Sequence, residues 1–228
     1  MTRNYEVNTD QTLDTVNQLL DEGITKICAL IRHSDRFYST EPGMEPFMGL
    51  TDNGKKYAYD FGTRLRSAFP PKLYSSLMGR CVETAYLIDK GFAACHGSNL
   101  EHNRMDKTLF AFYIKDFEKA VRMFRSMNAN TFLREWFDGK LDDTIMQDPQ
   151  ETVDTLVRFI DEQVRSLDGQ QIGICVSHDW NIYPIKEFKM GLSLETSGSV
   201  GYLDGVVFFE KNGTTYLTSH QMDTPIPL

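Results

Sequence analysis

One seven-residue stretch, Leu30-Ile31-Arg32-His33-Ser34-Asp35-Arg36, constrains this chain more than any other. It begins at the end of a short, mostly apolar run, 24–31, which is suited to a buried strand of a parallel sheet. The run ends abruptly in two arginines, a histidine and an aspartate. Ligands of open α/β sheets bind outside the carboxyl ends of the strands, so the stretch predicts one wall of a binding site. A solvated loop with a chance histidine is the alternative interpretation.

Two later segments repeat this arrangement of an apolar run followed by residues of a catalytic type. Residues 73–85 place Arg80 after one run, and residues 172–181 place His178 and Asp179 after another. Three such strand ends would bring together one cluster of side chains, namely Arg32, His33, Arg36, Arg80 and His178.

In this order, the segments resemble the histidine phosphatase superfamily, which includes phosphoglycerate mutases and histidine acid phosphatases. That family carries an Arg-His-Gly signature after its first strand, an arginine after its second and a second histidine after a late strand. Here those positions are Arg32-His33-Ser34, Arg80 and His178, and Leu50-Thr51-Asp52-Asn53-Gly54 resembles the family's Leu-Thr-x-x-Gly element. The resemblance extends from about residue 24 to 210 and is sharp in these four patches. Ser34 departs from it, because the family usually has a glycine there, where the backbone approaches phosphate.

The resemblance implies a site for phosphoryl transfer. His33 would be the nucleophile that forms a phosphohistidine, with its second ring nitrogen held so that the tautomer is fixed. Arg32, Arg36 and Arg80 suit the equatorial phosphate oxygens, because a guanidinium stays charged and binds bidentately. His178 would donate a further hydrogen bond and stabilise the transition state.

Three carboxyl groups compete for the role of proton donor to the leaving group. Asp179 directly follows His178, and this pair resembles the acid-phosphatase branch, where that aspartate protonates the leaving group. The short chain is more similar to the mutase branch, whose acid is a glutamate after the second strand–helix unit. Glu101 or Asp106 occupies that place here. We favour Asp179.

These residues predict a metal-independent phosphomonoester hydrolase that uses no cofactor and acts on a small phosphorylated substrate. A phosphoglycerate-mutase-type phosphotransferase would use the same residues, and a non-catalytic phosphoester-binding module on the same fold is a third interpretation. A metallohydrolase with His33, Asp35, His178 and Asp179 as ligands is disfavoured, because the neighbouring arginines would repel a divalent cation. Neither the physiological substrate nor the oligomeric state follows from the sequence.

Charge and cysteine content limit the expected binding partners and the expected cellular compartment. The 228 residues carry a formal net charge of −8, which gives no general attraction to nucleic acid or to anionic membranes. The four cysteines, at positions 28, 81, 95 and 175, form no Cys-x-x-Cys motif, so we expect a reduced, cytoplasmic protein. We recognise no signal peptide and no apolar stretch long enough to span a bilayer.

Hydrophobic periodicity predicts a three-layer α/β/α sandwich with a mostly parallel sheet, in a single domain over residues 1–228. Helices are expected at about 10–22, from a cap at Thr51 to about Phe69, at 80–89 and from Asp148-Pro149 to Leu167. Strands should end near 31, 75 and 176, and Asn212-Gly213 predicts a C-terminal antiparallel hairpin with a type I′ turn. Residues 92–147, with helices near 116–127 and 130–138, form either a helical subdomain packed on itself or a helical insert that caps the site and selects the substrate.

Overall fold

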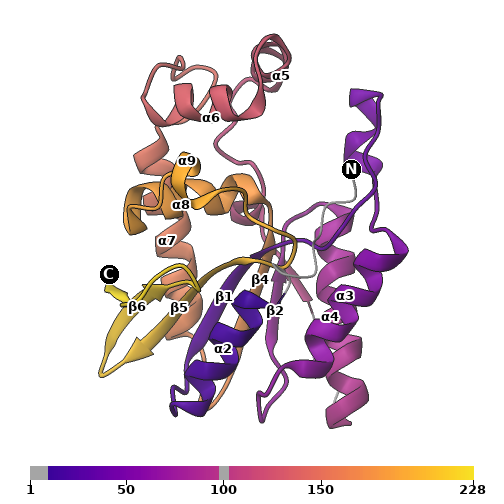
Figure 1. Cartoon of the computed structure of the whole chain (residues 1–228), viewed down its shortest axis with the longest axis vertical. Helices are drawn as coiled ribbons and strands as arrows, with labels where there is room; N and C mark the ends of the chain where they lie inside the picture. The colour runs from indigo at the N-terminus through magenta and orange to yellow at the C-terminus, as the bar shows by residue number, and fades with distance from the viewer. Residues whose placement is uncertain (1–9, 98–102) are drawn as a thin grey trace.

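The computed structural model describes residues 10–97 and 103–228 (Figure 1). A seven-stranded sheet has the strand order β3-β2-β4-β1-β5-β6-β7. Four strands are parallel, namely β1 (Ile27–Arg32), β2 (Lys72–Ser75), β3 (Asn103–Met105) and β4 (Ile172–Ser177). The last three extend the sheet in antiparallel fashion, namely β5 (Gly205–Lys211), β6 (Thr214–Thr218) and β7 (Ile226–Pro227). This confirms the mostly parallel α/β sandwich that the sequence predicts.

The two faces of the sheet carry separate hydrophobic cores. Ala29 and Ile31 of β1 pack in the core that includes α2 (Gln11–Asp21), α3 (Asp52–Arg64) and α4 (Gly79–His96). Cys28 and Leu30 pack in the opposite core, with α6 (Ala129–Phe137), α7 (Pro149–Arg165) and α8 (Asp179–Met190). Successive side chains of a strand point to opposite faces, so a strand covered on both faces needs the continuous apolar run that its sequence shows.

Two glycines bring the backbones of α3 and α4 into contact. A Cβ atom on Gly62 would lie 2.0 Å from the carbonyl oxygen of Ile88, and one on Gly91 would lie 1.9 Å from that of Tyr59. Any larger residue at either position would push the helices apart. Helix α4, which carries Arg80 in its first turn, is thereby held firmly against α3.

The start of α3 is determined by residues close in the sequence, whereas its end is determined by a contact with a distant residue. Thr51 Oγ1 accepts a hydrogen bond from the N–H of Gly54 at 2.9 Å, which confirms the predicted cap. The helix ends at Arg64, earlier than the predicted end near Phe69. Asn17 of α2 forms two hydrogen bonds where the helix ends. Its Nδ2 donates to the carbonyl of Arg64, and its Oδ1 accepts from the backbone N–H of Arg66. Local periodicity cannot reveal a contact with a residue 47 positions away.

Left-handed backbone conformations mark the end of α4 and the C-terminal hairpin. Helix α4 continues past the predicted end at Asp89 to His96, and Gly97 follows it with φ of 68°. Asn212 and Gly213, between β5 and β6, have φ of 53° and 78°, as a type I′ turn requires. The predicted hairpin is therefore confirmed. Within the described parts of the chain, no helix combines the length and apolar character needed to cross a membrane.

Residues 92–147 contain a strand as well as helices. Strand β3 lies in this segment and pairs with β2 at the edge of the sheet, and three residues are too few to give a strand signal in the sequence. η2 (Lys107–Leu109), α5 (Phe117–Ser126) and α6 follow, with α5 and α6 close to their predicted bounds. These two helices stand beyond α8 at one end of the molecule (Figure 1). We refer to residues 107–137 as the helical lobe; its role as a cap stays a prediction.

Candidate active site

The carboxyl ends of the central strands lie side by side. Strands β1 and β4 pair in register as far as Arg32 and Ser177, and β2 ends beside β4. His33 and His178 are the next residues after these two strands. Their ring centroids lie 5.5 Å apart. The fold therefore joins the first and third of the sequence segments that we expected to meet.

His33 is buried, with 2% of its surface exposed, and both of its ring nitrogens are engaged. Its Nδ1 lies 2.8 Å from the carbonyl oxygen of Ser34, which can only accept a hydrogen bond. Its Nε2 lies 3.1 Å from Nε of Arg80, and a guanidinium can only donate. The proton is therefore on Nδ1, and the lone pair is on Nε2.

His178 is oriented by the same arginine. Its Nδ1 faces Nη2 of Arg80 at 3.5 Å, and its Nε2 lies 3.0 Å from Oγ of Ser76. Burial, reinforced by the charges of Arg80 and Arg32, lowers the pKa of His178 to about 3. Burial, together with His178 and the same arginines, also holds the pKa of His33 well below its ordinary value. Both imidazoles are therefore neutral at pH 7, and the arginines supply the positive charge.

Each of the three predicted arginines has one N–H group that finds no partner in residues 10–97 and 103–228. Arg32 is 8% exposed, and its Nη2 lies 3.1 Å from Oδ2 of Asp179. Arg36 pairs with Glu45 at 2.5 Å. Nevertheless, Nε of Arg32, Nε of Arg36 and Nη1 of Arg80 are buried and have no hydrogen-bond partner among the described residues. Buried donors without acceptors are costly, so three of them beside one histidine pair indicate an anion site.

Two tyrosines that no sequence motif indicated lie against these arginines. The guanidinium of Arg32 lies 4.3 Å from the ring centroid of Tyr202, and that of Arg36 lies 3.9 Å from the ring centroid of Tyr38. The two hydroxyl oxygens are 2.7 Å apart. This contact ties the loop after β1 to the segment before β5. Because 164 residues separate the two tyrosines, no local pattern announces their meeting.

Helices α3 and α4 fix the loop after β1. Ser34 is fully buried; its N–H donates to Oγ1 of Thr84 at 3.1 Å, and its Oγ donates to the carbonyl of Gly54 at 2.7 Å. A Cβ atom on Gly54 would lie 2.0 Å from the carbonyl oxygen of Asp35, so only glycine lets the loop approach the first turn of α3. The serine that departs from the family pattern thus anchors the loop. Thr84 follows Arg80 by one helical turn, and that spacing was an available signal for it.

The candidate acids have different surroundings. Asp179 lies beside Arg32, and its charge also acts on Arg80. Asp106 lies after β3, where its Oδ1 accepts from the N–H of Thr108 at 2.8 Å and caps η2. Glu101 lies outside the described residues. Asp179 is therefore the one described candidate that directly contacts an arginine of the anion site.

The residues of the metallohydrolase alternative have separate partners. His33 receives the Arg80 N–H, Asp179 pairs with Arg32, and Asp35 accepts a hydrogen bond from Thr51 at 2.7 Å. Among residues 10–97 and 103–228, no three His, Cys, Asp or Glu side chains are grouped to hold a metal ion. The separate partners of these residues do not favour the metallohydrolase alternative.

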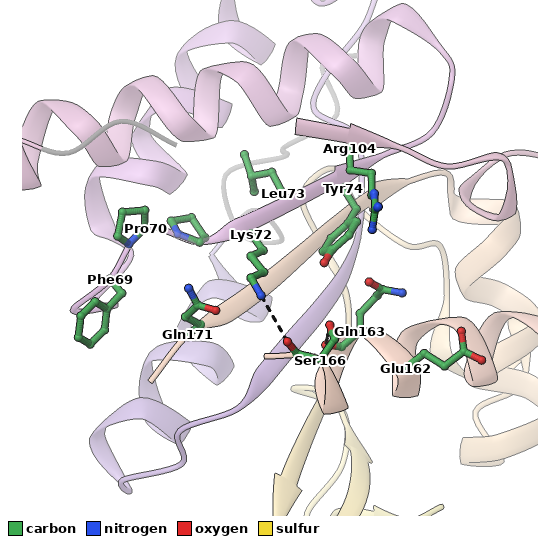
Figure 2. A pocket seen from close by; sticks show the side chains of 11 residues that line it. Phe69, Pro70, Lys72, Leu73, Tyr74, Arg104, Glu162, Gln163, Ser166 and Gln171 are labelled. Carbon is green, nitrogen blue, oxygen red and sulfur yellow. Dashed lines mark hydrogen bonds between the residues drawn. The ribbon is translucent and has the colours of Figure 1, made fainter. Parts of the chain in front are cut away.

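A groove of about 620 Å³ lies elsewhere, between the start of β2, β3 and the C-terminal part of α7 (Figure 2). Lys72 in this groove donates to the carbonyl of Ser166 at 3.3 Å, and Arg104 and Tyr74 lie farther along it. The lining residues include none of the histidines and arginines of the anion site. The groove is therefore separate from the cluster at the strand ends.

Comparisons with known proteins bear on the family and the fold of the chain. The family model of the histidine phosphatase superfamily (branch 1) matches residues 28–196. One similar solved structure is a phosphoglycerate mutase from Bacillus anthracis str. Sterne, with 16% identity and a TM-score of 0.57 over 87% of this chain and 94% of that chain. Another is Bacillus stearothermophilus YhfR, with 18% identity and a TM-score of 0.57 over 85% and 95%. A mutant phosphoserine phosphatase from Entamoeba histolytica has 16% identity and a TM-score of 0.52 over 86% and 99%. At these identities the likeness shows the fold alone, and a search of curated proteins found no match.

Proposed function

This chain belongs to the histidine phosphatase superfamily, and from that premise we propose that it is a metal-independent phosphomonoester hydrolase. One observation carries the proposal. A neutral His33, with its lone pair on Nε2, lies among three arginines that each have a buried N–H with no partner in the part of the chain that the structure describes. A phosphate dianion brings acceptors for those donors and compensates their charge.

In the first step, Nε2 of His33 attacks phosphorus and forms a P–N bond while the P–O bond to the leaving group breaks. The Ser34 carbonyl accepts a hydrogen bond from Nδ1–H at 2.8 Å and stabilises the positive charge that develops on the ring. Arg80 exchanges its hydrogen bond to Nε2 for bonds to the phosphoryl oxygens. These oxygens also bind Arg32 and Arg36, which lie ready for the charge of the transition state.

Asp179 supplies the proton that the departing oxygen needs. Its position beside Arg32, at 3.1 Å, supports this role over Asp106, whose Oδ1 caps η2. In the second step a water molecule attacks the phosphohistidine, Asp179 takes up its proton, the P–N bond breaks, and inorganic phosphate leaves.

Hydrolysis of a panel of phosphomonoesters, with and without a chelator, tests the proposal. We expect hydrolysis to survive the chelator and to be inhibited by vanadate, which mimics five-coordinate phosphorus. His33→Ala should lose nearly all turnover and the acid-labile phosphoenzyme, whereas His96→Ala, at an exposed position, should keep both. Loss of activity with chelator and its recovery with a divalent metal would contradict the proposal, as would full turnover in His33→Ala. Transfer of the phosphoryl group to an added alcohol in place of water would indicate the phosphotransferase instead.

A further inference from the structure

An apolar pocket lies between the helical lobe and α8, and one of its lining residues follows the proposed acid in the sequence. The pocket has a volume of about 190 Å³. It is lined by Ile114, Ala120, Val121, Phe124, Phe132 and Trp180. Trp180 directly follows Asp179 in the first turn of α8, and its backbone N–H donates to Oδ1 of Asp179 at 3.0 Å. One wall of the pocket is therefore formed by the residue that follows the proposed acid in the sequence.

Three aromatic rings give the pocket a fixed shape. Trp180 is stacked on Phe132 with a centroid distance of 5.6 Å, and Phe124 lies 5.6 Å from Trp180 and 5.9 Å from Phe132. Phe132 is 1% exposed and cannot move without disturbing the core, whereas Phe124 keeps 38% of its surface exposed. All six lining side chains are aliphatic or aromatic, so the pocket favours an apolar group.

We propose that this pocket binds an aromatic ring of the leaving group, so that the substrate is a phosphomonoester of an aryl-substituted alcohol. The volume suits one ring, because an apolar cavity of about 150 Å³ binds benzene. The rings of Trp180 and Phe132 favour an aromatic guest over an alkyl chain through stacking. The inference rests on the proposed function, because it needs the phosphoryl group to lie at His33 while the rest of the substrate extends past Asp179.

A matched pair of substrates tests the inference on the wild-type protein. Propyl phosphate and 3-phenylpropyl phosphate release alcohols of similar basicity, so they differ mainly in the ring. We expect kcat/KM to be roughly tenfold to a hundredfold higher for the phenyl compound, as burial of a ring implies. The non-hydrolysable phosphonates of the same two alkyl groups add a binding measurement, in which only the phenyl compound should change the tryptophan fluorescence strongly.

Val121 offers a variant that closes the pocket and a matched control that opens it. Val121→Phe, on α5, should raise KM for the phenyl substrate and reduce its advantage to about twofold or less, with propyl phosphate turnover unchanged. Val121→Ala should keep the preference. Thermal unfolding of both variants checks that they fold. If Val121→Phe does not fold, the binding of the two phosphonates to the wild-type protein tests the inference instead.

The possible failures are distinguishable. Equal kcat/KM for the two substrates in the wild type, or a preference that survives in Val121→Phe, would overturn the inference and leave the proposed function standing. Absence of hydrolysis for both of them and for p-nitrophenyl phosphate would overturn the proposed function as well. A change of molecular mass in solution in Val121→Phe, without a change in preference, would make the pocket a contact between copies of the chain and also overturn the inference.

Discussion

Two environments for arginine in this protein are opposite in character. Arg134 of α6 is bound by carboxylates, with hydrogen bonds of 2.9 and 3.2 Å to Glu187 and of 2.9 and 2.6 Å to Glu195. These bonds, those to Glu187 foremost, raise its pKa, and they connect the helical lobe to α8 and to α9 (Leu194–Ser197). Arg80 lies between two neutral histidines instead. Burial lowers its pKa, and its Nη1 has no partner among the described residues.

This difference separates an arginine that holds the fold together from arginines prepared for a ligand. The donors of Arg134 are satisfied by the protein itself, so an added anion would have to displace carboxylates. Each of the three arginines at the strand ends has one buried N–H donor with no acceptor among the described residues, an arrangement that lowers stability and that folding alone does not favour. We attribute it to the phosphoryl group of the substrate, and four measurements test that interpretation.

The largest effect should distinguish Arg80 from Arg134. Arg80→Ala should lower kcat by roughly 10²–10³-fold, because it removes a donor to the developing charge. Its free energy of unfolding should equal or exceed that of the wild type, because a desolvated charge is lost. Arg134→Ala should keep kcat/KM within about twofold and lose about 1 kcal/mol of stability. Steady-state kinetics and urea denaturation check both variants, and a large loss of activity in Arg134→Ala would contradict the comparison.

Arg32 is the intermediate case, because its Nη2 already pairs with Asp179. If Asp179 is the general acid, Asp179→Asn should slow alkyl phosphates by about a hundredfold or more and p-nitrophenyl phosphate much less, since p-nitrophenolate departs without a proton. If Asp179 is only a counter-ion, as Glu187 is for Arg134, both substrates should lose equally. The same pair of assays on Asp106→Asn and Glu101→Gln would then show whether the acid lies in segment 92–147.

The third measurement uses the effect of the buried arginines on their histidines. Burial and the arginines lower the pKa of His178 from 6.5 to about 3, so between these values the unfolded chain binds more protons than the folded one. The free energy of unfolding should therefore be highest above pH 6.5 and fall toward pH 3, by up to about 1.4 kcal/mol per pH unit from this group. His178→Gln should remove this part of the slope, and His96→Gln should not. Denaturant titrations across this range would refute the prediction if all three proteins gave equal slopes.

The smallest effect concerns the contact between the two tyrosine hydroxyls. Tyr38→Phe keeps the ring against Arg36 and removes the 2.7 Å hydrogen bond to Tyr202. We expect the inhibition constant of inorganic phosphate to rise roughly fivefold, which corresponds to about 1 kcal/mol, with little change in kcat. Tyr86→Phe is the matched control, because Tyr86 and Tyr38 are both 55% exposed. A change in kcat without a change in phosphate affinity would show that the hydroxyl pair does not position the arginines.

The parts of the fold that could be predicted have local causes. A strand buried on both faces is a continuous apolar run, and the residues that follow it in the sequence also follow it in space, as His33 and His178 do. The cap at Thr51 is likewise a local signal. The parts that could not be predicted depend on distant contacts: Asn17 ends α3, and Tyr202 meets Tyr38 across the site. Strand β3 is short and lies at an edge, so its sequence carries no distinct pattern. The roles of the site residues stay predictions, because geometry alone does not identify a reaction.

The close approach of Gly54 to the carbonyl of Asp35 has a consequence for mutational tuning of this protein. Because a Cβ atom there would lie 2.0 Å from that oxygen, a single added methyl group must displace either the loop that carries Arg36 or the first turn of α3. A substitution of the uncharged Gly54 would therefore change the position of Arg36 relative to the other arginines without replacing any of the proposed reacting groups. A substitution there changes the geometry of the loop and leaves every arginine and histidine of the site in place.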